Sequence, residues 1–231
     1  ATAQDTRLFE LRTYYANPGK LEGLHARFRD HTVKLFEKHG MTQLGYWVPA
    51  DNKENKLVYV LAYADKAARD KAWKGFLGDP AWKKAYADSI SDGKLVKKVV
   101  RVFMQATDYS PKITSTKGKV ERLFQLRTYT TPEGKLNDLH ARFRDHTVGL
   151  FVKHGFTNIA YWNPVEKKDG AEQTLIYMIG NDSEAAFKSS FDGFRKDSAW
   201  QKARAESEKN GKLTTKVVGV YMVPTDYSPT R

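Results

Sequence analysis

The stretch His25-Ala-Arg-Phe-Arg-Asp-His-Thr-Val33 decides the fold of this chain, because it returns unchanged as residues 140–148, 115 positions later. The similarity extends beyond these nine residues: 17 of the 23 positions from 25 to 47 are identical to their partners in 140–162. Self-similarity over such a length is typical of the repetition of a whole structural unit. The sequence therefore predicts two units in the 231 residues.

Within each unit the hydrophobic pattern predicts the order strand, helix, strand, strand, helix, strand. Alternating apolar residues indicate strands, and apolar residues three and four apart indicate helices. In the first unit the expected strands cover 8–15, 42–48, 57–63 and 96–105, and the expected helices cover 20–39 and 65–90, with a restart at Pro80. The second unit repeats this order with a hairpin turn that is three residues longer.

The predicted order is that of the ferredoxin-like fold. One four-stranded sheet with helices on one face leaves its other face uncovered, and two copies can cover each other by packing these faces. We therefore expect an α+β protein in which two tandem ferredoxin-like (βαββαβ) repeats, residues 1–115 and 116–231, form one barrel within the chain. Thr107-Asp-Tyr-Ser-Pro111 ends the first repeat, Thr225-Asp-Tyr-Ser-Pro229 ends the second, and residues 112–119 form a short polar linker.

The chain is basic, with 39 Lys and Arg against 27 Asp and Glu and a net charge of +12. Such a charge attracts polyanions, but the lysines occur singly and in pairs, and neither a zinc-finger spacing nor a Gly-aromatic RNA-binding signature occurs. We therefore expect a solvated basic surface and no nucleic-acid partner. Since no apolar run approaches the roughly 20 residues that a membrane-spanning helix needs, we expect a soluble protein without a membrane span.

The sequence contains no cysteine, which excludes disulfides, thiolate catalysis and Cys-ligated metals. No Walker loop, dinucleotide fingerprint or serine elbow occurs, and we predict no cofactor. The chain starts Ala-Thr-Ala-Gln-Asp without Met. This start is consistent with a mature chain exported to a periplasm or secreted after signal cleavage, and equally with a chain that was trimmed.

Several motifs, in this order along the chain, resemble those of the NIPSNAP family. They are Glu10-Leu-Arg-Thr-Tyr14, Pro18-Gly-Lys20, His25-Ala-Arg-Phe-Arg-Asp-His-Thr32, His39-Gly40 and Gly45-Tyr-Trp47. The third and fourth recur unchanged in the second copy, and each of the others recurs with one replacement. The resemblance implies a dimeric α+β barrel, a superfamily that also contains cofactor-free monooxygenases, isomerases and haem enzymes. Animal NIPSNAP proteins are mitochondrial and work through protein partners. The second copy departs from the pattern at Gln125, Glu133 and Ala160, which replace Glu10, Pro18 and Gly45.

The six histidines, at 25, 31, 39, 140, 146 and 154, all lie in the repeated block. Within one helix His25 and His31 lie about 120° apart, and His31 and His39 about 12 Å apart along the axis, so neither pair can share a metal ion. We predict no metal, although a site built from both copies stays open. His31 lies on the stripe Leu24-Phe28-His31-Leu35, where we expect either a neutral core histidine or a proton-transfer group at a cavity.

The first strand places Phe9, Leu11 and Thr13 on one side and Glu10, Arg12 and Tyr14 on the other. If the apolar side meets the helices, the polar side faces the barrel interior, where buried charges must be paired or must serve a ligand. The alternatives are a salt-bridge network, such as Glu10 with Arg12 or Arg127, and a pocket for an anionic or polar aromatic ligand. The candidate ligand-binding residues are Glu10, Arg12, Tyr14, His31 and Trp47, with their equivalents Gln125, Arg127, Tyr129, His146 and Trp162.

Because Gln125 lacks the charge of Glu10, we expect an anion to prefer the Arg127 side. Arg27, Arg29 and Asp30 are expected on a solvated charged face or in ion pairs between the repeats.

Two functional interpretations follow. The first, which we favour, is a non-catalytic binding or adaptor protein of the NIPSNAP type that holds a small polar or anionic ligand between the repeats or works through a protein partner. The alternative is a cofactor-independent monooxygenase or isomerase that uses His31 or His146 as acid and base. Catalysis thus stays open, and the sequence also permits a homo-oligomer.

Overall fold

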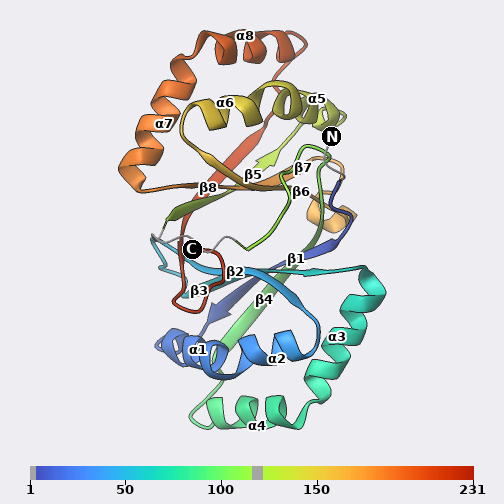
Figure 1. Cartoon of the computed structure of the whole chain (residues 1–231), viewed down its shortest axis with the longest axis vertical. Helices are drawn as coiled ribbons and strands as arrows, with labels where there is room; N and C mark the ends of the chain where they lie inside the picture. The colour runs from blue at the N-terminus through green and yellow to red at the C-terminus, as the bar shows by residue number, and fades with distance from the viewer. Residues whose placement is uncertain (1–3, 116–121) are drawn as a thin grey trace. The chain divides into compact units, whose positions relative to one another are not determined.

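Both repeats fold in the predicted order, as shown by a computed structural model that describes residues 4–115 and 122–231 (Figure 1). Residues 116–119 of the predicted linker and the first three residues lie outside the described residues. The first repeat consists of β1 (Leu8–Ala16), α1 (Leu21–Arg27), η1 (Phe28–Thr32), α2 (Val33–Lys38), β2 (Thr42–Pro49), β3 (Lys56–Tyr63), α3 (Lys66–Gly78), α4 (Pro80–Ser89) and β4 (Val96–Ala106).

The second repeat has the same elements and one additional short helix in its longer hairpin turn. It consists of β5 (Leu123–Thr130), α5 (Leu136–Arg142), η2 (Phe143–Thr147), α6 (Val148–Lys153), β6 (Thr157–Pro164), η3 (Lys167–Asp169), β7 (Thr174–Asn181), α7 (Glu184–Lys196), α8 (Ser198–Ser207) and β8 (Lys216–Pro224). Among the helices of the described residues, none is long and apolar enough to cross a bilayer.

The strands follow the order β1-β3-β2-β8-β5-β7-β6-β4 and close into a barrel. Within the first repeat β3 pairs antiparallel with β1 and with β2, and β7 pairs in the same way with β5 and β6 in the second. The predicted α+β fold of two ferredoxin-like halves with one barrel is therefore confirmed.

Helix ends in the first repeat follow the local chemistry of the sequence. The side chain of Asp65 accepts a hydrogen bond from the backbone N–H of Ala68 at 2.8 Å, and that of Asp79 from Ala81 at 2.9 Å. These two caps satisfy N–H groups that the first turn of a helix leaves unpaired. They separate α3 from α4 at Pro80 and so set the corner between the two helices.

Each repeat packs with the exit segment that follows the other repeat. One compact unit combines Thr6–Met104 with Val223–Arg231, and the other combines Gln105–Ile113 with most of the second repeat. In the first unit the Tyr227 hydroxyl lies 2.8 Å from His25 Nδ1, and Arg29 Nε donates to Asp226 at 2.6 Å. The ion pair expected for Arg29 between the two repeats of the sequence is thus present.

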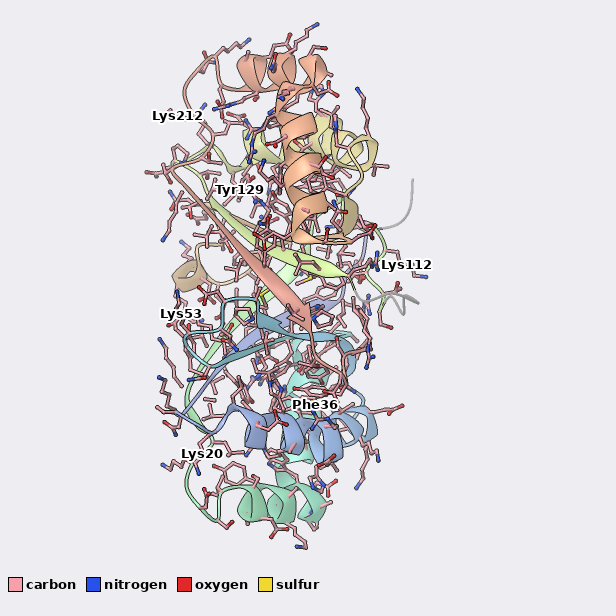
Figure 2. The ribbon with its side chains drawn as sticks, turned by 90° about the vertical axis from the view of Figure 1, so that its left-hand side faces the viewer. Lys20, Phe36, Lys53, Lys112, Tyr129 and Lys212 are labelled. Atoms are coloured by element: carbon pink, nitrogen blue, oxygen red, sulfur yellow. The ribbon has the colours of Figure 1, made fainter. Side chains whose placement is uncertain are left out.

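The core of the first unit lies between its helices and one face of its strands. Phe28 contacts Tyr14, Tyr46 and Tyr59 with ring centroids 5.3–5.9 Å apart. Figure 2 shows Phe36 inside this layer, whereas lysines such as Lys53 project from the periphery. The equivalent core of the second unit is built around Phe143 and Tyr177.

The predicted direction of the first strand is wrong. Tyr14 packs against Phe28 of η1, and Glu10 contacts Arg69 of α3, so the side of β1 that carries the charged residues faces the helices. Phe9 and Leu11 are buried on the opposite face. The assignment failed because α3 supplies a cation and aromatic rings that make this face suitable for charged side chains, which the alternation of one strand cannot reveal.

Candidate functional site

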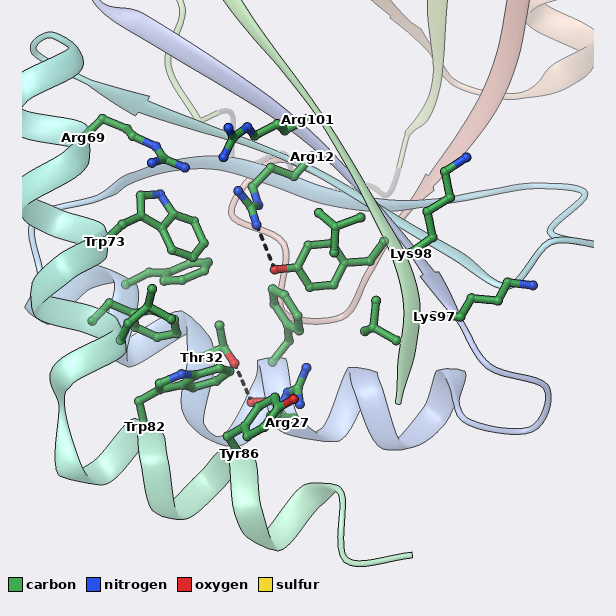
Figure 3. Close-up of a pocket in the computed structure, with 17 residues that line it drawn as sticks. Arg12, Arg27, Thr32, Arg69, Trp73, Trp82, Tyr86, Lys97, Lys98 and Arg101 are labelled. Atoms are coloured by element: carbon green, nitrogen blue, oxygen red, sulfur yellow. Dashed lines mark hydrogen bonds between the residues drawn. The ribbon is translucent and has the colours of Figure 1, made fainter. Parts of the chain in front are cut away.

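A pocket of about 510 Å³ opens in the first repeat, between its helices and strands β1 and β4 (Figure 3). Its volume lies within the range of pockets that hold small organic ligands. No Asp or Glu lines it. The cationic lining residues are Arg12, Arg27, Arg69, Lys97, Lys98 and Arg101, and the aromatic ones are Tyr14, Phe28, Phe36, Trp73, Phe76, Trp82 and Tyr86.

At one end of the pocket a buried carboxylate binds two arginines. Glu10 is fully buried and accepts hydrogen bonds from Arg12 Nη1 at 2.6 Å, from Arg69 Nη2 and Nε at 3.0 and 3.1 Å, and from the Tyr63 hydroxyl at 3.0 Å. Burial alone would raise the pKa of Glu10, but the hydrogen bond from Arg69 and the charge of Arg12 lower this pKa below its usual value. The predicted salt bridge between Glu10 and Arg12 is present, and Arg69 extends it.

Arg12 uses every nitrogen of its guanidinium within the protein. Nη1 donates to Glu10, Nε to the Tyr59 hydroxyl at 2.9 Å, and Nη2 to the Tyr14 hydroxyl at 3.2 Å. The guanidinium also lies 4.3 Å from the ring centroid of Trp73, a cation–π geometry. Arg12 is therefore a fixed wall of the pocket.

Arg27, at the other end of the pocket, is buried without a carboxylate. Its side chain packs on the rings of Trp82 and Tyr86 at 5.3 and 5.2 Å, and Nη1 donates to Ser89 Oγ at 3.2 Å. Its Nε is buried without a hydrogen-bond partner, and it forms no ion pair with any described residue. Burial lowers the pKa of Arg27, although a guanidinium stays charged at neutral pH. A buried charge in this state is costly unless an anion approaches it.

The π-helical turn η1 determines which residues of the first helix face the pocket. The backbone N–H of Val33 bonds to the carbonyl of Phe28, five residues earlier, and the Thr32 hydroxyl donates to the carbonyl of Arg27 at 3.1 Å. A π-helical turn contains more residues than an α-helical one and so shifts the following side chains around the axis. As a result Arg27, Phe28 and Thr32 line the pocket.

The same turn overturns the prediction for His31. A regular 3.6-residue period places His31 on the buried stripe, but η1 puts Thr32 there, with 1% exposed surface, and leaves His31 exposed. His146 is exposed for the same reason, because η2 repeats the turn and buries Thr147. The expected solvated position of Arg27 is wrong as well, whereas Asp30 is exposed as predicted.

In the second repeat the equivalent pocket has a volume of only about 210 Å³. Arg142, the counterpart of Arg27, pairs there with Glu208 at 3.0 Å, which stands where the first repeat has Ile90. Arg127 donates to neutral partners, Gln125 at 2.7 Å and the Tyr177 hydroxyl at 2.8 Å. The buried arginine of the second repeat thus has the carboxylate that Arg27 lacks.

The two pockets do not support the expectation that an anion prefers the Arg127 side. Gln125 does lack the charge of Glu10, but in the first repeat Arg69 adds a second cation to Glu10, whereas Phe187 replaces Arg69 in the second. Six cationic residues and no acidic one line the first pocket, against four cationic residues and Glu208 in the second. Charge and volume therefore both favour the first repeat.

The structure brings only some of the predicted site residues together. Arg12 and Tyr14 line the first pocket with Glu10 directly behind them, and Arg127 and Tyr129 line the second beside Gln125. Trp47 and Trp162 are buried but line neither of these pockets. Their neighbours Tyr46 and Tyr161 face the helix-side cores. Since side chains alternate along a strand, both tryptophans point to the opposite face.

The remaining histidines hold structural elements in place. His25 and His140 lie 2.8 Å from the hydroxyls of Tyr227 and Tyr109, and His39 lies 2.8 Å from the capping carboxylate of Asp79. His154 bonds to Asp197 in the same way. Across residues 4–115 and 122–231, no group of three or more His, Asp or Glu side chains is arranged to hold a metal ion.

Sequence reasoning missed the residues that distinguish the two pockets, although the repeat itself carries a signal for them. Two residues that line the first pocket differ in the second copy, where Phe187 replaces Arg69 and Gly219 replaces Arg101, and Glu208 of the second pocket replaces Ile90. Each change removes a cation or adds a carboxylate. An alignment of the two copies that looks for changes of charge would have indicated that the arginine at position 27 lacks the carboxylate that its counterpart Arg142 has.

Comparison with known proteins gives one family and several solved structures. The NIPSNAP family model matches residues 9–111 and 124–229. Two proposed monooxygenases, from Lactobacillus acidophilus and Fusobacterium nucleatum, have TM-scores of 0.63 and 0.61 with 11% and 10% identity. The matches cover 98% and 95% of this chain and 97% and 92% of those chains. A NIPSNAP family protein of unknown function from Agrobacterium tumefaciens is 21% identical over 46% of this chain and 93% of its own, with a TM-score of 0.41. A search of curated proteins finds no match.

Proposed function

Because this chain belongs to the NIPSNAP family, whose model matches both of its repeats, we propose that it is a binding protein that holds a small aromatic anion in the pocket of the first repeat. The sequence predicted a ligand between the repeats; the proposed site is instead formed by the first repeat alone. One ligand binds per chain, since the second repeat has already neutralised its buried arginine with Glu208.

The observation that carries this proposal is the state of Arg27. The residue is only 5% exposed, its Nε has no partner, and no described carboxylate pairs with it. Arg142 is equally buried and its Nε is also unpaired, so the carboxylate of Glu208 is what distinguishes the two arginines. Most buried polar groups are satisfied, and an unsatisfied one next to a pocket is a specific feature to explain. A carboxylate, sulfonate or phosphate at Arg27 would supply both the missing acceptor and the missing charge. The rings of Trp82, Tyr86 and Phe28 would enclose an aromatic or other flat apolar group.

The alternative, a cofactor-independent oxygenase or isomerase, has less support from the site. His31 and His146, the acid and base of that hypothesis, are exposed and do not line the Arg27 pocket. The two proposed monooxygenases share the fold with this chain at 10–11% identity, and a shared fold alone does not imply a shared chemistry. The geometry therefore favours binding without catalysis.

The matched pair Arg27→Met and Arg142→Met tests the proposal with naphthalene-2-carboxylate as the probe. We expect Arg27→Met to weaken binding at least about tenfold, the loss of one charge-assisted hydrogen bond, and Arg142→Met to leave it within about twofold. Isothermal titration calorimetry measures both. Arg27→Met should fold normally, because replacing a buried unpaired charge by an apolar side chain is neutral or stabilising.

The neutral analogue naphthalene-2-carboxamide serves as the control for charge, and we expect it to bind much more weakly than the acid. Equal binding of acid and amide, or equal effects of the two substitutions, would contradict an anion site at Arg27.

A further inference from the structure

We infer that the ligand of this pocket is an elongated dianion, with two anionic groups separated by a flat apolar middle; this inference rests on the proposed function. The pocket has two cationic ends and an aromatic wall between them (Figure 3). Arg27 forms the first end, beside Tyr86 of α4. Arg101 of β4, with Arg12 and Arg69, forms the second end (Figure 3).

The second end has more positive charge than its carboxylates neutralise. Arg69 and Arg101 lie on the same ring, with their guanidinium carbons 5.3 and 5.5 Å from the centroid of Phe103. Glu10 holds Arg12 and Arg69, and the exposed Asp70 holds Lys66 and also contacts Arg69 at 3.1 Å. Four cations, Arg12, Lys66, Arg69 and Arg101, thus face two carboxylates, Glu10 and Asp70, which leaves an excess of two positive charges.

Arg101 is the cation of this end that is available to a ligand. It is exposed, it lines the pocket, and it forms no hydrogen bond or ion pair with any residue that the structure describes. Arg12 has used all its nitrogens, and Arg69 is bound to two carboxylates. A second anionic group would therefore bind Arg101, with the charge of Arg69 beside it.

The wall between the two ends is aromatic. Phe76 and Trp82 lie with ring centroids 4.3 Å apart, and Trp73 lies 5.5 Å from Phe76, towards Arg12 and Arg69. An apolar group placed between two charged groups would bury its surface here, while each charge meets one end. A compact anion would satisfy only one end.

The second repeat lacks this arrangement. Gly219 stands in place of Arg101 and Phe187 in place of Arg69, and a side chain at Gly219 would approach Arg127 to about 3.1 Å. The second pocket therefore has no counterpart of the Arg101 end. Arg69 and Arg101, which make the first pocket more positive than the second, thus also give it a second cationic end.

Three naphthalene carboxylates test the inference by calorimetry at physiological ionic strength. Naphthalene-2,6-dicarboxylate carries its anionic groups at opposite ends, naphthalene-2,3-dicarboxylate carries the same charge at one end, and naphthalene-2-carboxylate carries one group. We expect the 2,6-isomer to bind about tenfold more tightly than the monoacid, the equivalent of one favourable ion pair. The 2,3-isomer should gain less than about threefold.

Arg101→Met should abolish the advantage of the 2,6-isomer and should weaken binding of the monoacid much less than Arg27→Met does. This substitution removes no hydrogen bond or ion pair with a described residue, only the packing of an exposed guanidinium on Phe103, so we expect the fold to be retained. Arg27→Met should weaken binding of both ligands.

Equal affinities for the 2,6-diacid and the monoacid, with the dependence on Arg27 retained, would overturn the inference of a dianion, while the proposed function would stand. An equal gain for both diacids would overturn it too, since total charge would then explain the preference. Loss of the Arg27 dependence itself would overturn both.

Discussion

Replacing Glu10 with glutamine is expected to destabilise the first repeat by about 3 kcal/mol, the usual cost of removing one partner from a buried ion pair. Glu10 is fully buried and is the only described carboxylate that contacts Arg12. Glutamine has a similar shape, but it leaves two guanidiniums facing each other without a negative charge between them. Its amide group would also direct N–H donors at arginine donors. Urea denaturation followed by tryptophan fluorescence measures the loss.

The pH dependence of this effect has a definite sign. Because the folded protein lowers the pKa of Glu10, the stabilisation by its charge is fully present above the usual glutamate pKa, about 4.3. It is lost as the pH falls through the lowered value. The difference between wild type and Glu10→Gln should therefore be constant near neutral pH and shrink in acid.

The second repeat provides the control for this substitution. Gln125 occupies the equivalent position and bonds to Arg127 at 2.7 Å, so Gln125→Glu adds a carboxylate beside an arginine that has none. We expect a change of no more than about 1 kcal/mol, because desolvation of the new charge offsets its attraction. A Glu10→Gln variant as stable as wild type would show that Arg12 and Arg69 do not depend on the carboxylate.

Replacing Tyr227 with alanine is expected to destabilise the first repeat, although the residue belongs to the end of the second. The Tyr227 ring lies 5.3 Å from Tyr46 and stacks on Phe28 at 6.2 Å, and its hydroxyl bonds to His25. The loss should be about 3 kcal/mol, the range for removing a large aromatic side chain from a packed site. Hydrogen exchange should show reduced protection in β1–β3 and unchanged protection in β5–β7.

Tyr109→Ala is the reciprocal control. Tyr109 contacts His140 and Tyr161 of the second repeat, so its loss should reduce protection in β5–β7 and leave β1–β3 unchanged. The opposite result would be that Tyr227→Ala reduces protection in β5–β7 and Tyr109→Ala reduces it in β1–β3. Each exit segment would then pack on the repeat that precedes it in the sequence, which would contradict the packing described under Overall fold.

The fold was predictable because the same order of strands and helices could be derived independently from each of the two copies. Alternation, helical spacing and the caps at Asp65 and Asp79 are local signals, and the structure follows them within one or two residues. Two identical copies of His25–Val33 also made a shared fold the simplest interpretation. Local sequence signals were therefore sufficient to predict the order of the elements and the ferredoxin-like topology.

The site was only partly predictable, because it depends on two features that local rules do not contain. The π-helical turn at Phe28–Thr32 changes the period of the helix, so a regular wheel buries His31 where the protein buries Thr32. The side of β1 that faces the helices is determined by contacts with Arg69 and Trp73, which lie more than fifty residues away in the sequence. The expected pairing of Glu10 with Arg12 was correct because it joins neighbours on one face of one strand.

The most direct test of the Arg27 site observes its unpaired Nε–H by NMR. In ¹⁵N–¹H spectra of arginine side chains, Arg27→Met assigns one resonance and Arg142→Met assigns its counterpart. During titration with naphthalene-2-carboxylate, an anion at the site would give Arg27 Nε–H the acceptor that it lacks. An anion site at Arg27 predicts a saturable shift of the Arg27 resonance. The Nε–H of Arg142 is unpaired as well, but Glu208 neutralises that guanidinium through Nη1, so we expect the Arg142 resonance to stay in place. An unmoved Arg27 resonance at saturating ligand, or equal shifts of both, would contradict an anion site at Arg27.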